Sequence, residues 1–371
     1  MSEAKGEKQT VALYIGGLGG GGAERICVNL ANKLADDGFL VSLVVFNLLN
    51  DKYSYLLKDK VKLINLNVRA RYVLPKLITY SLKNNVRIAV AFSHEVAVLL
   101  VVVRMLTFKK FKIVARNINN LKKIYEVSSS RWGKLIVQPL VRMLYPKVDF
   151  VINQCRRMEI DLIDWLPSLK GKTNYIYNPY TQTIDEGESK KVFSEDYVLC
   201  VGRLEAQKGF HYAIEGFSRI KNRYPELMLY FVGEGGLEYS LREAAKEHGV
   251  TDRIRFFGYQ KDVSQFYKGA RATMLTSLYE GFPNVLIESI SVGTPVVAFD
   301  CPSGPSEIVI SGVNGMLVDY KKVDDLCVKL CMVLDAPPSY ETVIESSKIF
   351  SWEKIFFRYR DVLDEVCSKD T

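Results

Sequence analysis

Short apolar runs alternate with segments of helical period along most of the chain. The run Val11–Ile15 precedes residues 23–37, in which Ile26, Leu30 and Leu34 recur on one helical face. Further apolar runs predict strands at 39–46, 62–66, 88–92, 112–115 and 150–153. Because these runs are continuous rather than alternating, they indicate strands buried on both faces, as in a parallel sheet covered by helices.

The alternation stops near residue 178 and then restarts. Asn178-Pro179 precedes a polar stretch, 181–191, that has no periodicity and predicts an interdomain linker. Beyond it, apolar runs predict strands at 197–201, 228–232, 254–257, 272–275, 296–299 and 315–318. Helical periods predict helices at 210–224, 237–248, 263–268, 285–292, 306–310, 324–334 and 352–367. The chain is therefore predicted to form two doubly wound α/β domains, 1–178 and 179–350, followed by a last helix within 351–371.

Composition and charge refine this picture. The 371 residues are 48% hydrophobic and 25% charged, which is typical of a globular protein long enough for two domains. Residues 1–178 carry 28 Lys/Arg and 13 Asp/Glu, whereas residues 179–371 carry 22 and 29. Within 52–147 the counts are 20 and 3, so we expect the first half to meet an anionic partner.

Neither a membrane span nor a metal-binding framework is predicted. The polar N-terminus has no signal-peptide core, and the longest apolar run, 96–103, is far shorter than the roughly 20 residues of a membrane span. Any membrane contact is therefore expected to be peripheral. Seven Cys without a CxxC pair, and three His, favour reduced thiols in a cytosolic enzyme over disulfides or a zinc site.

A glycine-rich loop follows the first predicted strand. Residues 17–22, GLGGGG, satisfy G-x-G-x-x-G between a strand and a helix, where backbone amides can approach a phosphate. A dinucleotide site also needs an acidic residue at the end of the second strand. Asp51 is the first acid there and lies too far along the chain. A phosphate-binding or merely flexible loop is favoured over a dehydrogenase site, and a structural glycine turn remains an alternative.

Two further segments place charged side chains where predicted strands meet helices. VGRLEAQKG puts Arg203 and Lys208 in a loop where the two cations could clamp a diphosphate, the alternative being two solvated surface cations. In EGFPNVLIES, Pro283 suits a helix start with free amides at residues 284–286. Glu280 precedes that helix and Glu288 lies within it, so one carboxylate can reach a sugar hydroxyl and the other a ribose.

At these residues the sequence resembles the retaining glycosyltransferases of the GT-B fold, in glycosyltransferase family four. Glu280 and Glu288 match the E-x7-E motif of that family, and GGLGGGGAER, VGRLEAQKGF and Tyr177-Asn178-Pro179 match its other motifs. CPSGPSEI is similar to enzymes of bacterial O-antigen, capsule and lipid-linked N-glycan assembly. The resemblance implies two Rossmann-like domains that face each other across a cleft, with the last helix crossing back to the first domain.

The resemblance also implies roles for individual residues. Arg203 and Lys208 would bind the diphosphate of the donor, Glu280 the transferred hexose and Glu288 the ribose. His94 would meet the donor sugar, a local structural role being the alternative. The remaining donor-binding residues that it implies are Gly17, Gly19, Gly20, Gly258, Tyr259, Gly281, Phe282, Asn284, Val285 and Leu286. The family needs no metal or other cofactor, and this chain has no D-x-D triplet that would anchor a divalent ion.

Basic and aromatic residues mix in the first domain. Residues 131–145 have an apolar and a basic face, as in segments that lie in the headgroup layer of anionic membranes. A membrane or lipid diphosphate is favoured over nucleic acid, and a helix packed in the domain with solvated cations remains an alternative. The residues expected to contact acceptor or membrane are Arg116, Arg131, Trp132, Lys134 and Arg142.

The sequence thus predicts a metal-independent, retaining transferase that moves a hexose or N-acetylhexosamine from a UDP-sugar to a polyprenyl-diphosphate-linked glycan. The resemblance implies a role in lipopolysaccharide, O-antigen or other surface polysaccharide assembly, with undecaprenyl diphosphate as lipid carrier. The expected location is peripheral, on the cytoplasmic face of the inner membrane. A UDP-sugar epimerase of the same architecture and a non-catalytic scaffold of an assembly complex remain alternatives.

Overall fold

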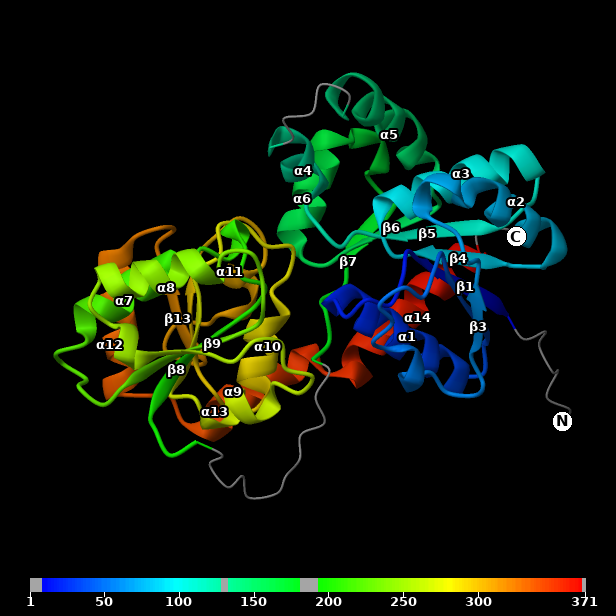
Figure 1. Cartoon of the computed structure of the whole chain (residues 1–371). Coiled ribbons are helices and arrows are strands. Elements are labelled where there is room, and N and C mark those ends of the chain that lie inside the picture. Colours follow the sequence, from blue (N-terminus) through cyan, green and yellow to red (C-terminus); the bar gives the residue numbers. More distant parts are fainter. Residues whose placement is uncertain (1–8, 128–132, 181–192, 369–371) are drawn as a thin grey trace, which may run out of the picture. The chain divides into compact units, whose positions relative to one another are not determined.

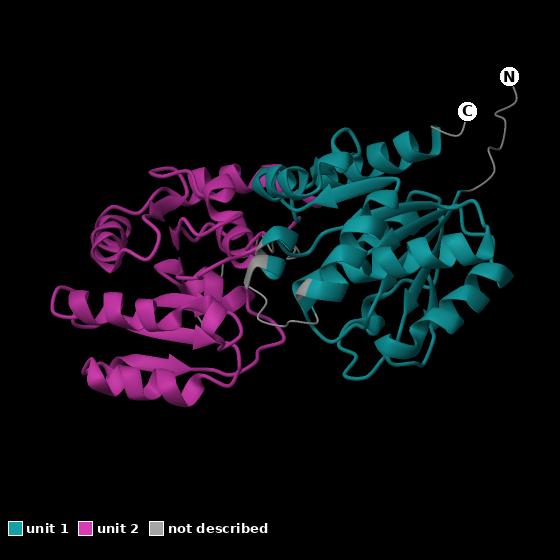
Figure 2. Ribbon diagram, turned by 90° about the horizontal axis from the view of Figure 1, so that it is seen from above, with its two compact units in different colours: residues 1–178, 353–371 teal, residues 179–352 magenta. Residues whose placement is uncertain are grey.

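The computed structural model describes residues 9–127, 133–180 and 193–368, and the chain forms two compact units. Unit 1 comprises residues 1–178 and 353–371, and unit 2 comprises residues 179–352 (Figure 2). The linker predicted at 181–191 lies outside the described residues. Each unit is built on its own parallel sheet.

Unit 1 contains a seven-stranded sheet with the order β3-β2-β1-β4-β5-β6-β7, in which neighbouring strands are parallel. The strands are β1 (Thr10–Ile15), β2 (Leu40–Val45), β3 (Lys62–Asn65), β4 (Ile88–Ala91), β5 (Lys112–Arg116), β6 (Phe150–Asn153) and β7 (Thr173–Tyr175). The chain order reverses between β1 and β4. The carboxyl ends of these two strands therefore flank a topological switch point, where open α/β sheets bind ligands.

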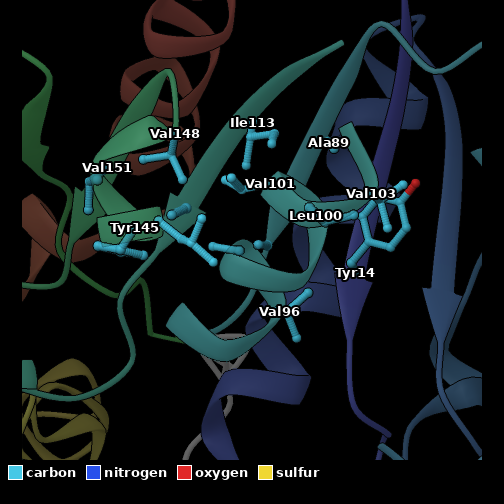
Figure 3. Packing of buried hydrophobic residues seen from close by; sticks show 14 of the residues in the cluster. Tyr14, Ala89, Val96, Leu100, Val101, Val103, Ile113, Tyr145, Val148 and Val151 are labelled. Carbon is cyan, nitrogen blue, oxygen red and sulfur yellow. The ribbon is translucent and has the colours of Figure 1, made fainter. Parts of the chain in front are cut away.

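Helices cover both faces of this sheet (Figure 1). They are α1 (Gly22–Asp36), α2 (Val73–Lys83), α3 (His94–Thr107), α4 (Leu121–Val127), α5 (Gln138–Leu144), α6 (Arg156–Trp165) and α14 (Trp352–Ser368). Figure 3 shows Leu100 and Val101 of α3 packing among side chains of the strands, including Ala89 and Ile113. Helix α14 lies on the same face as α1 (Figure 1), and its Arg360 pairs with Asp37 at the end of α1.

Unit 2 contains a six-stranded parallel sheet with the order β10-β9-β8-β11-β12-β13. The strands are β8 (Tyr197–Val201), β9 (Met228–Val232), β10 (Ile254–Phe256), β11 (Ala272–Leu275), β12 (Val296–Phe299) and β13 (Gly315–Val318). The helices are α7 (Phe210–Ile220), α8 (Glu238–Glu247), α9 (Ser264–Gly269), α10 (Asn284–Ser291), α11 (Pro305–Ile308), α12 (Val323–Asp335) and α13 (Tyr340–Ser347). Its switch point lies between β8 and β11.

The prediction of two doubly wound parallel-sheet domains is confirmed. The sequence pattern does not predict strand β7 or helix α13, and it gives no range for helices α2, α3, α4 and α6. Strand β7 is a short, polar edge strand, Thr-Asn-Tyr, and helix α13 follows Pro337-Pro338, where the apolar pattern is weak. The seven Cys are all free thiols, and Cys327 and Cys331 are partly buried against the apolar core of unit 2.

Candidate functional site

The two loops that flank the switch point of unit 2 are hydrogen-bonded to each other. Thr276 Oγ1 donates to the carbonyl of Lys208 (3.1 Å), and the Leu278 N–H donates to the carbonyl of Gln207 (2.8 Å). Gly209 has φ 57°, and a Cβ there would lie 2.3 Å from the carbonyl oxygen of Thr276. Because only glycine permits this approach, the loops after β8 and β11 form one platform at the carboxyl edge of the sheet.

Lys208 and Glu280 form an ion pair on this platform. Lys208 Nζ lies 2.7 Å from Glu280 Oε1, and Ser277 Oγ donates to the same oxygen at 2.6 Å. The Lys208 and Glu280 side chains are 17% and 9% exposed, so water screens their attraction weakly. These bonds leave Oε2 of Glu280 and further protons of the ammonium group unused. The pair can therefore donate to one ligand group and accept from another.

Arg203 lies on the same loop but pairs with a different carboxylate. Arg203 Nη1 lies 3.0 Å from Glu205 Oε1, and the two side chains are 72% and 46% exposed. An exposed ion pair of this kind contributes about 0–1 kcal/mol, so the guanidinium is easily released to another anion. Of the two cations predicted to clamp a diphosphate, Lys208 is held in place and Arg203 can reorient.

Glu288 lies within α10 and is hydrogen-bonded to a buried tyrosine. Tyr267 OH donates to Glu288 Oε2 at 3.1 Å, and the Tyr267 side chain is completely buried. Burial, and secondarily the Glu288 carboxylate, raise the pKa of Tyr267 well above its usual value. The phenol therefore stays protonated and keeps the half-buried carboxylate in one orientation.

Helix α10 begins at Asn284, directly after Pro283. The Leu286 N–H donates to the carbonyl of Pro283 at 3.1 Å, and the Leu286 side chain is completely buried. The expectation of a free amide at Leu286 is therefore wrong, because the first turn of the helix already uses that donor. Asn284 and Val285 are half-buried at the start of the helix.

Gly281 and Phe282 connect Glu280 to the start of α10. Phe282 is 5% exposed and packs against Phe350, with ring centroids 5.8 Å apart. A Cβ on Gly304 would lie 2.6 Å from Cδ of Pro283 and 3.2 Å from the carbonyl oxygen of Gly281. This close packing fixes the turn that carries Glu280 into the helix.

The loops after β9 and β10 meet the same edge. The Gly233 N–H donates to the carbonyl of Gly258 at 2.8 Å, and a Cβ on Gly233 would lie 2.0 Å from the carbonyl oxygen of Gly202. Gly258 has φ 64°, and Tyr259, which follows it, is 43% exposed. The Tyr259 ring is thus accessible to a ligand such as a base.

In unit 1, the glycine-rich loop packs against the segment that follows β2. A Cβ on Gly17 would lie 3.3 Å from the carbonyl oxygen of Asn47, and one on Gly20 would lie 2.8 Å from Cδ of Lys52. A Cβ on Gly19 would meet a backbone oxygen only at 4.0 Å. The Glu24 carboxylate lies beside Gly21 at the start of α1, a position that disfavours a bound anion there.

His94 is the first residue of α3, at the switch point of unit 1. Ser93 Oγ accepts a hydrogen bond from the Val96 N–H (3.2 Å) and caps the helix. His94 Nε2 lies 3.2 Å from Tyr125 OH, and Nδ1 lies 3.2 Å from Glu95 Oε2. Burial lowers the pKa of His94, although the Glu95 carboxylate acts in the opposite direction. Both ring nitrogens of His94 therefore have partners.

Arg116 is not a surface residue, and its predicted contact with acceptor or membrane is corrected by the structure. The side chain is 0% exposed, with Nε donating to Tyr359 OH (2.7 Å) and Nη2 to Asn178 Oδ1 (2.5 Å). Its guanidinium lies over the Phe92 ring, 5.2 Å from the centroid. These bonds tie the end of β5 to α14 and to the last residue of unit 1 before the chain enters unit 2.

The structure describes part of segment 131–145, which was predicted to have an apolar and a basic face. Arg131 and Trp132 lie outside the described residues, as does the Lys134 side chain. Arg142 is exposed, but it donates a hydrogen bond to the carbonyl oxygen of Trp165 (3.3 Å), and its guanidinium lies over the Trp165 indole ring. Segment 133–144 consists of a π-helical turn and α5, and it exposes large apolar side chains, namely Leu135, Ile136, Leu140 and Met143.

Two further properties concern metals and membranes. Within residues 9–127, 133–180 and 193–368, no three His, Cys, Asp or Glu side chains gather as a metal site requires. Helices with the length and hydropathy of a membrane span are absent from the described part of the chain.

Three site residues were not singled out from the sequence. Ser277, Tyr267 and Tyr125 bond to Glu280, Glu288 and His94, respectively. Ser277 follows β11 closely and so carried a positional signal. Tyr267 and Tyr125 lie on helices, and nothing in the sequence marks them as site residues, since a buried tyrosine usually contributes to packing.

Comparisons with known proteins show what this chain is similar to. Residues 182–350 match the family model described as Glycosyl transferases group 1. An uncharacterized glycosyltransferase of Haemophilus influenzae is 27% identical over 366 residues, covering 95% of this chain and 99% of that protein. A Campylobacter jejuni protein is 25% identical over 324 residues, covering 84% of this chain and 86% of its own length. Its name is N-acetylgalactosamine-N,N'-diacetylbacillosaminyl-diphospho-undecaprenol 4-alpha-N-acetylgalactosaminyltransferase.

Solved structures show the same fold. The apo form of the lipopolysaccharide outer core galactosyltransferase WaaB matches with a TM-score of 0.75 at 18% identity, covering 96% of this chain and 99% of that one. Anabaena Alr3699/HepE in complex with UDP-glucose matches with a TM-score of 0.78 at 18% identity and the same coverage. Residues 182–350 of this chain therefore resemble the Glycosyl transferases group 1 family, and the whole chain has the fold of two Rossmann-like domains that is also found in the WaaB and HepE structures.

Proposed function

We propose that this chain is a retaining, metal-independent transferase that moves a hexose or N-acetylhexosamine from a UDP-sugar to a polyprenyl-diphosphate-linked glycan. The observation that carries the proposal is the Lys208–Glu280 ion pair at the switch point of unit 2. It combines a cation for a diphosphate with a carboxylate oxygen for a sugar hydroxyl. The name of the Campylobacter jejuni relative includes a diphospho-undecaprenol glycan, and the structural neighbour HepE was solved in complex with UDP-glucose, which supports this choice of substrates.

The donor is proposed to bind mainly through side chains of unit 2. Lys208 donates to the diphosphate, and Arg203 leaves Glu205 to join it, which costs little because that pair is exposed. Glu280 accepts a hydrogen bond from a hydroxyl of the transferred sugar through Oε2, since Oε1 already accepts from Lys208 and Ser277. Glu288 accepts hydrogen bonds from the ribose hydroxyls, and the exposed Tyr259 ring lies against the base.

The transfer is proposed to occur on one face of the sugar. The bond from C1 to the diphosphate oxygen breaks, and a bond from C1 to the acceptor hydroxyl oxygen forms on the same face. The hydroxyl proton passes to the departing diphosphate oxygen. Lys208 and Arg203 offset the charge that develops on the diphosphate, which is the task that a divalent cation has in metal-dependent transferases.

The acceptor is proposed to bind unit 1 at a membrane surface. Basic residues greatly outnumber acidic ones in 52–147, and segment 133–144 exposes Leu135, Ile136, Leu140 and Met143. Apolar side chains next to basic residues suit the headgroup region of an anionic bilayer. This supports a peripheral location on the cytoplasmic face of the inner membrane, where a lipid-diphosphate acceptor is available.

The test is a transfer assay with UDP-sugars and polyprenyl-diphosphate-linked glycans, with and without EDTA, followed by assignment of the product anomer. We expect an α-linked product, turnover that survives EDTA, and a large loss of kcat in Lys208→Ala. Lys246→Ala is the matched control, because Lys246 is an exposed lysine in the last turn of α8. Epimerisation of the donor without acceptor, an inverted product or full turnover in Lys208→Ala would contradict the proposal.

A further inference from the structure

A cavity of about 410 Å³ opens at the carboxyl edge of the unit 1 sheet, beside β2 and β3. Its volume is within the range of about 300–1,000 Å³ that is usual for small-molecule sites. The cavity is displaced from the switch point between β1 and β4. The lining residues are Asn47, Leu48, Leu49, Asn65, Asn67, Val68 and Arg69.

Carboxamide groups dominate the polar part of the lining. Asn47 Oδ1 accepts from the Leu49 N–H (3.2 Å), and Asn65 Oδ1 accepts from the Asn67 N–H (2.9 Å). These bonds order the two loops and use only the oxygen of each amide. The NH₂ groups of Asn47 and Asn65, and both ends of the Asn67 amide, are left for a ligand. A ligand with several hydroxyl or carbonyl oxygens matches such a set.

The loop that carries Asn67 is held in a defined conformation. Asn67 has φ 51°, in the left-handed region that asparagine adopts more readily than most residues. The next residue, Val68, donates its N–H to the carbonyl of Phe46 at the end of β2 (2.8 Å). The two sides of the cavity are therefore joined by a backbone hydrogen bond.

Apolar side chains and charge complete the lining. Leu48, Leu49 and Val68 offer hydrocarbon surface, and Leu49 is 69% exposed. Hydrocarbon beside amides suits a pyranose, whose ring face presents C–H groups and whose periphery carries hydroxyls. Arg69 is the one charged residue among the described residues that line the cavity, and no carboxylate is among them. One cation beside three neutral amides favours an uncharged ligand with acceptor oxygens over a polyanion.

We propose that this cavity binds an uncharged pyranose residue, with free hydroxyl or acetamido groups, of the acceptor glycan. The proposal rests on the proposed function in taking a glycan as the acceptor. Asn47, Asn65 and Asn67 bond the substituents of the sugar, Arg69 donates to an acceptor oxygen, and the leucines contact the C–H face.

The test uses the full chain and two variants that keep the backbone. Asn67→Gly removes the amide, and glycine tolerates the left-handed φ. Asn47→Asp keeps the oxygen that accepts from Leu49 but replaces the NH₂ donor by a carboxylate oxygen. Asn50→Gly is the matched control, because Asn50 also has a left-handed φ, 61°, but does not line the cavity. Dissociation constants are measured by NMR titration with methyl glycosides of glucose, galactose, N-acetylglucosamine and N-acetylgalactosamine, and with methyl glucuronide and inorganic phosphate.

We expect at least one neutral glycoside to bind, and each lost hydrogen bond to weaken it about 2–10-fold in Asn67→Gly and Asn47→Asp. The control variant should bind like the wild type. The proposal is overturned if no neutral glycoside binds, if Asn67→Gly binds as tightly as the wild type, or if glucuronide or phosphate binds more tightly than every neutral glycoside. Donor turnover of the wild type is measured separately. Its absence, with glycoside binding intact, would count against the proposed function and not against this cavity.

Discussion

Removing one partner of the Lys208–Glu280 pair should destabilise unit 2 much more than removing both. Lys208→Met leaves a carboxylate on a side chain that is 9% exposed, with Ser277 bonded to it but no cation. Loss of one partner from a fully buried pair costs about 3–5 kcal/mol. Because the Lys208 side chain is 17% exposed, water can reach part of the site, and we expect about 2–3 kcal/mol.

The Glu280→Gln variant and the Lys208→Met/Glu280→Gln double variant are expected to lose less stability than Lys208→Met. Glu280→Gln leaves the ammonium group of Lys208 beside an amide oxygen, and a flexible lysine side chain can turn toward water, so we expect about 1–2 kcal/mol. In the double variant no charge remains, and the amide oxygen introduced at position 280 in place of the carboxylate still accepts from Ser277. Its stability should lie within about 1 kcal/mol of the wild type.

The assay is urea unfolding of the four proteins, analysed as a double-mutant cycle. We expect a coupling energy of about 2 kcal/mol or more between the two positions. Arg203→Met, which breaks the exposed pair with Glu205, is the matched control and should change stability by less than about 1 kcal/mol. Additive effects at positions 208 and 280, or a loss below about 0.5 kcal/mol in Lys208→Met, would refute the reasoning.

Three further predictions concern stability. Gly209→Ala places a Cβ against a neighbouring carbonyl, so it should lower the free energy of unfolding in urea by about 2 kcal/mol or more and also weaken donor binding. Gly312→Ala is the control, since Gly312 has φ 82° and open space around it, and it should lower the free energy of unfolding by about 1 kcal/mol. Arg116→Lys cannot keep both side-chain hydrogen bonds of the buried guanidinium and should cost about 2–4 kcal/mol, against less than about 0.5 kcal/mol for the exposed Arg142→Lys. Burial lowers the pKa of His94, so the unfolded chain takes up that proton more readily and stability should fall as the pH drops through about 6.5. His94→Gln should flatten this dependence of the urea midpoint, and an unchanged slope would count against the burial argument.

The sheets were predictable because buried parallel strands leave continuous apolar runs. Every strand with such a run was located to within one or two residues, whereas Thr173–Tyr175 was missed because it is an edge strand with polar side chains. The alternation of strands and helices implies right-handed crossovers, but it does not determine the strand order, because it leaves open where the order reverses.

The sequence predicted where the candidate site residues lie along the sheet edge, but not which of them bond to each other. Lys208 and Glu280 were both expected at the carboxyl edge, yet their pairing depends on two loops 72 residues apart in the chain. Arg116 was misplaced for a related reason. A charged residue is usually exposed, but here Asn178 and Tyr359, 62 and 243 residues away, supply bonds that keep it in the interior.

The central claim, that Lys208 and Glu280 hold the donor, is tested most directly by isothermal titration of UDP-sugars into the Lys208→Met/Glu280→Gln double variant. This variant is expected to be nearly as stable as the wild type, so a change in affinity reports on binding and not on folding. Loss of the charge-assisted bonds should weaken binding by about 1.5–3 kcal/mol, or roughly tenfold to more than a hundredfold. Equal affinity of the wild type and the stable double variant for every UDP-sugar that binds would contradict the account.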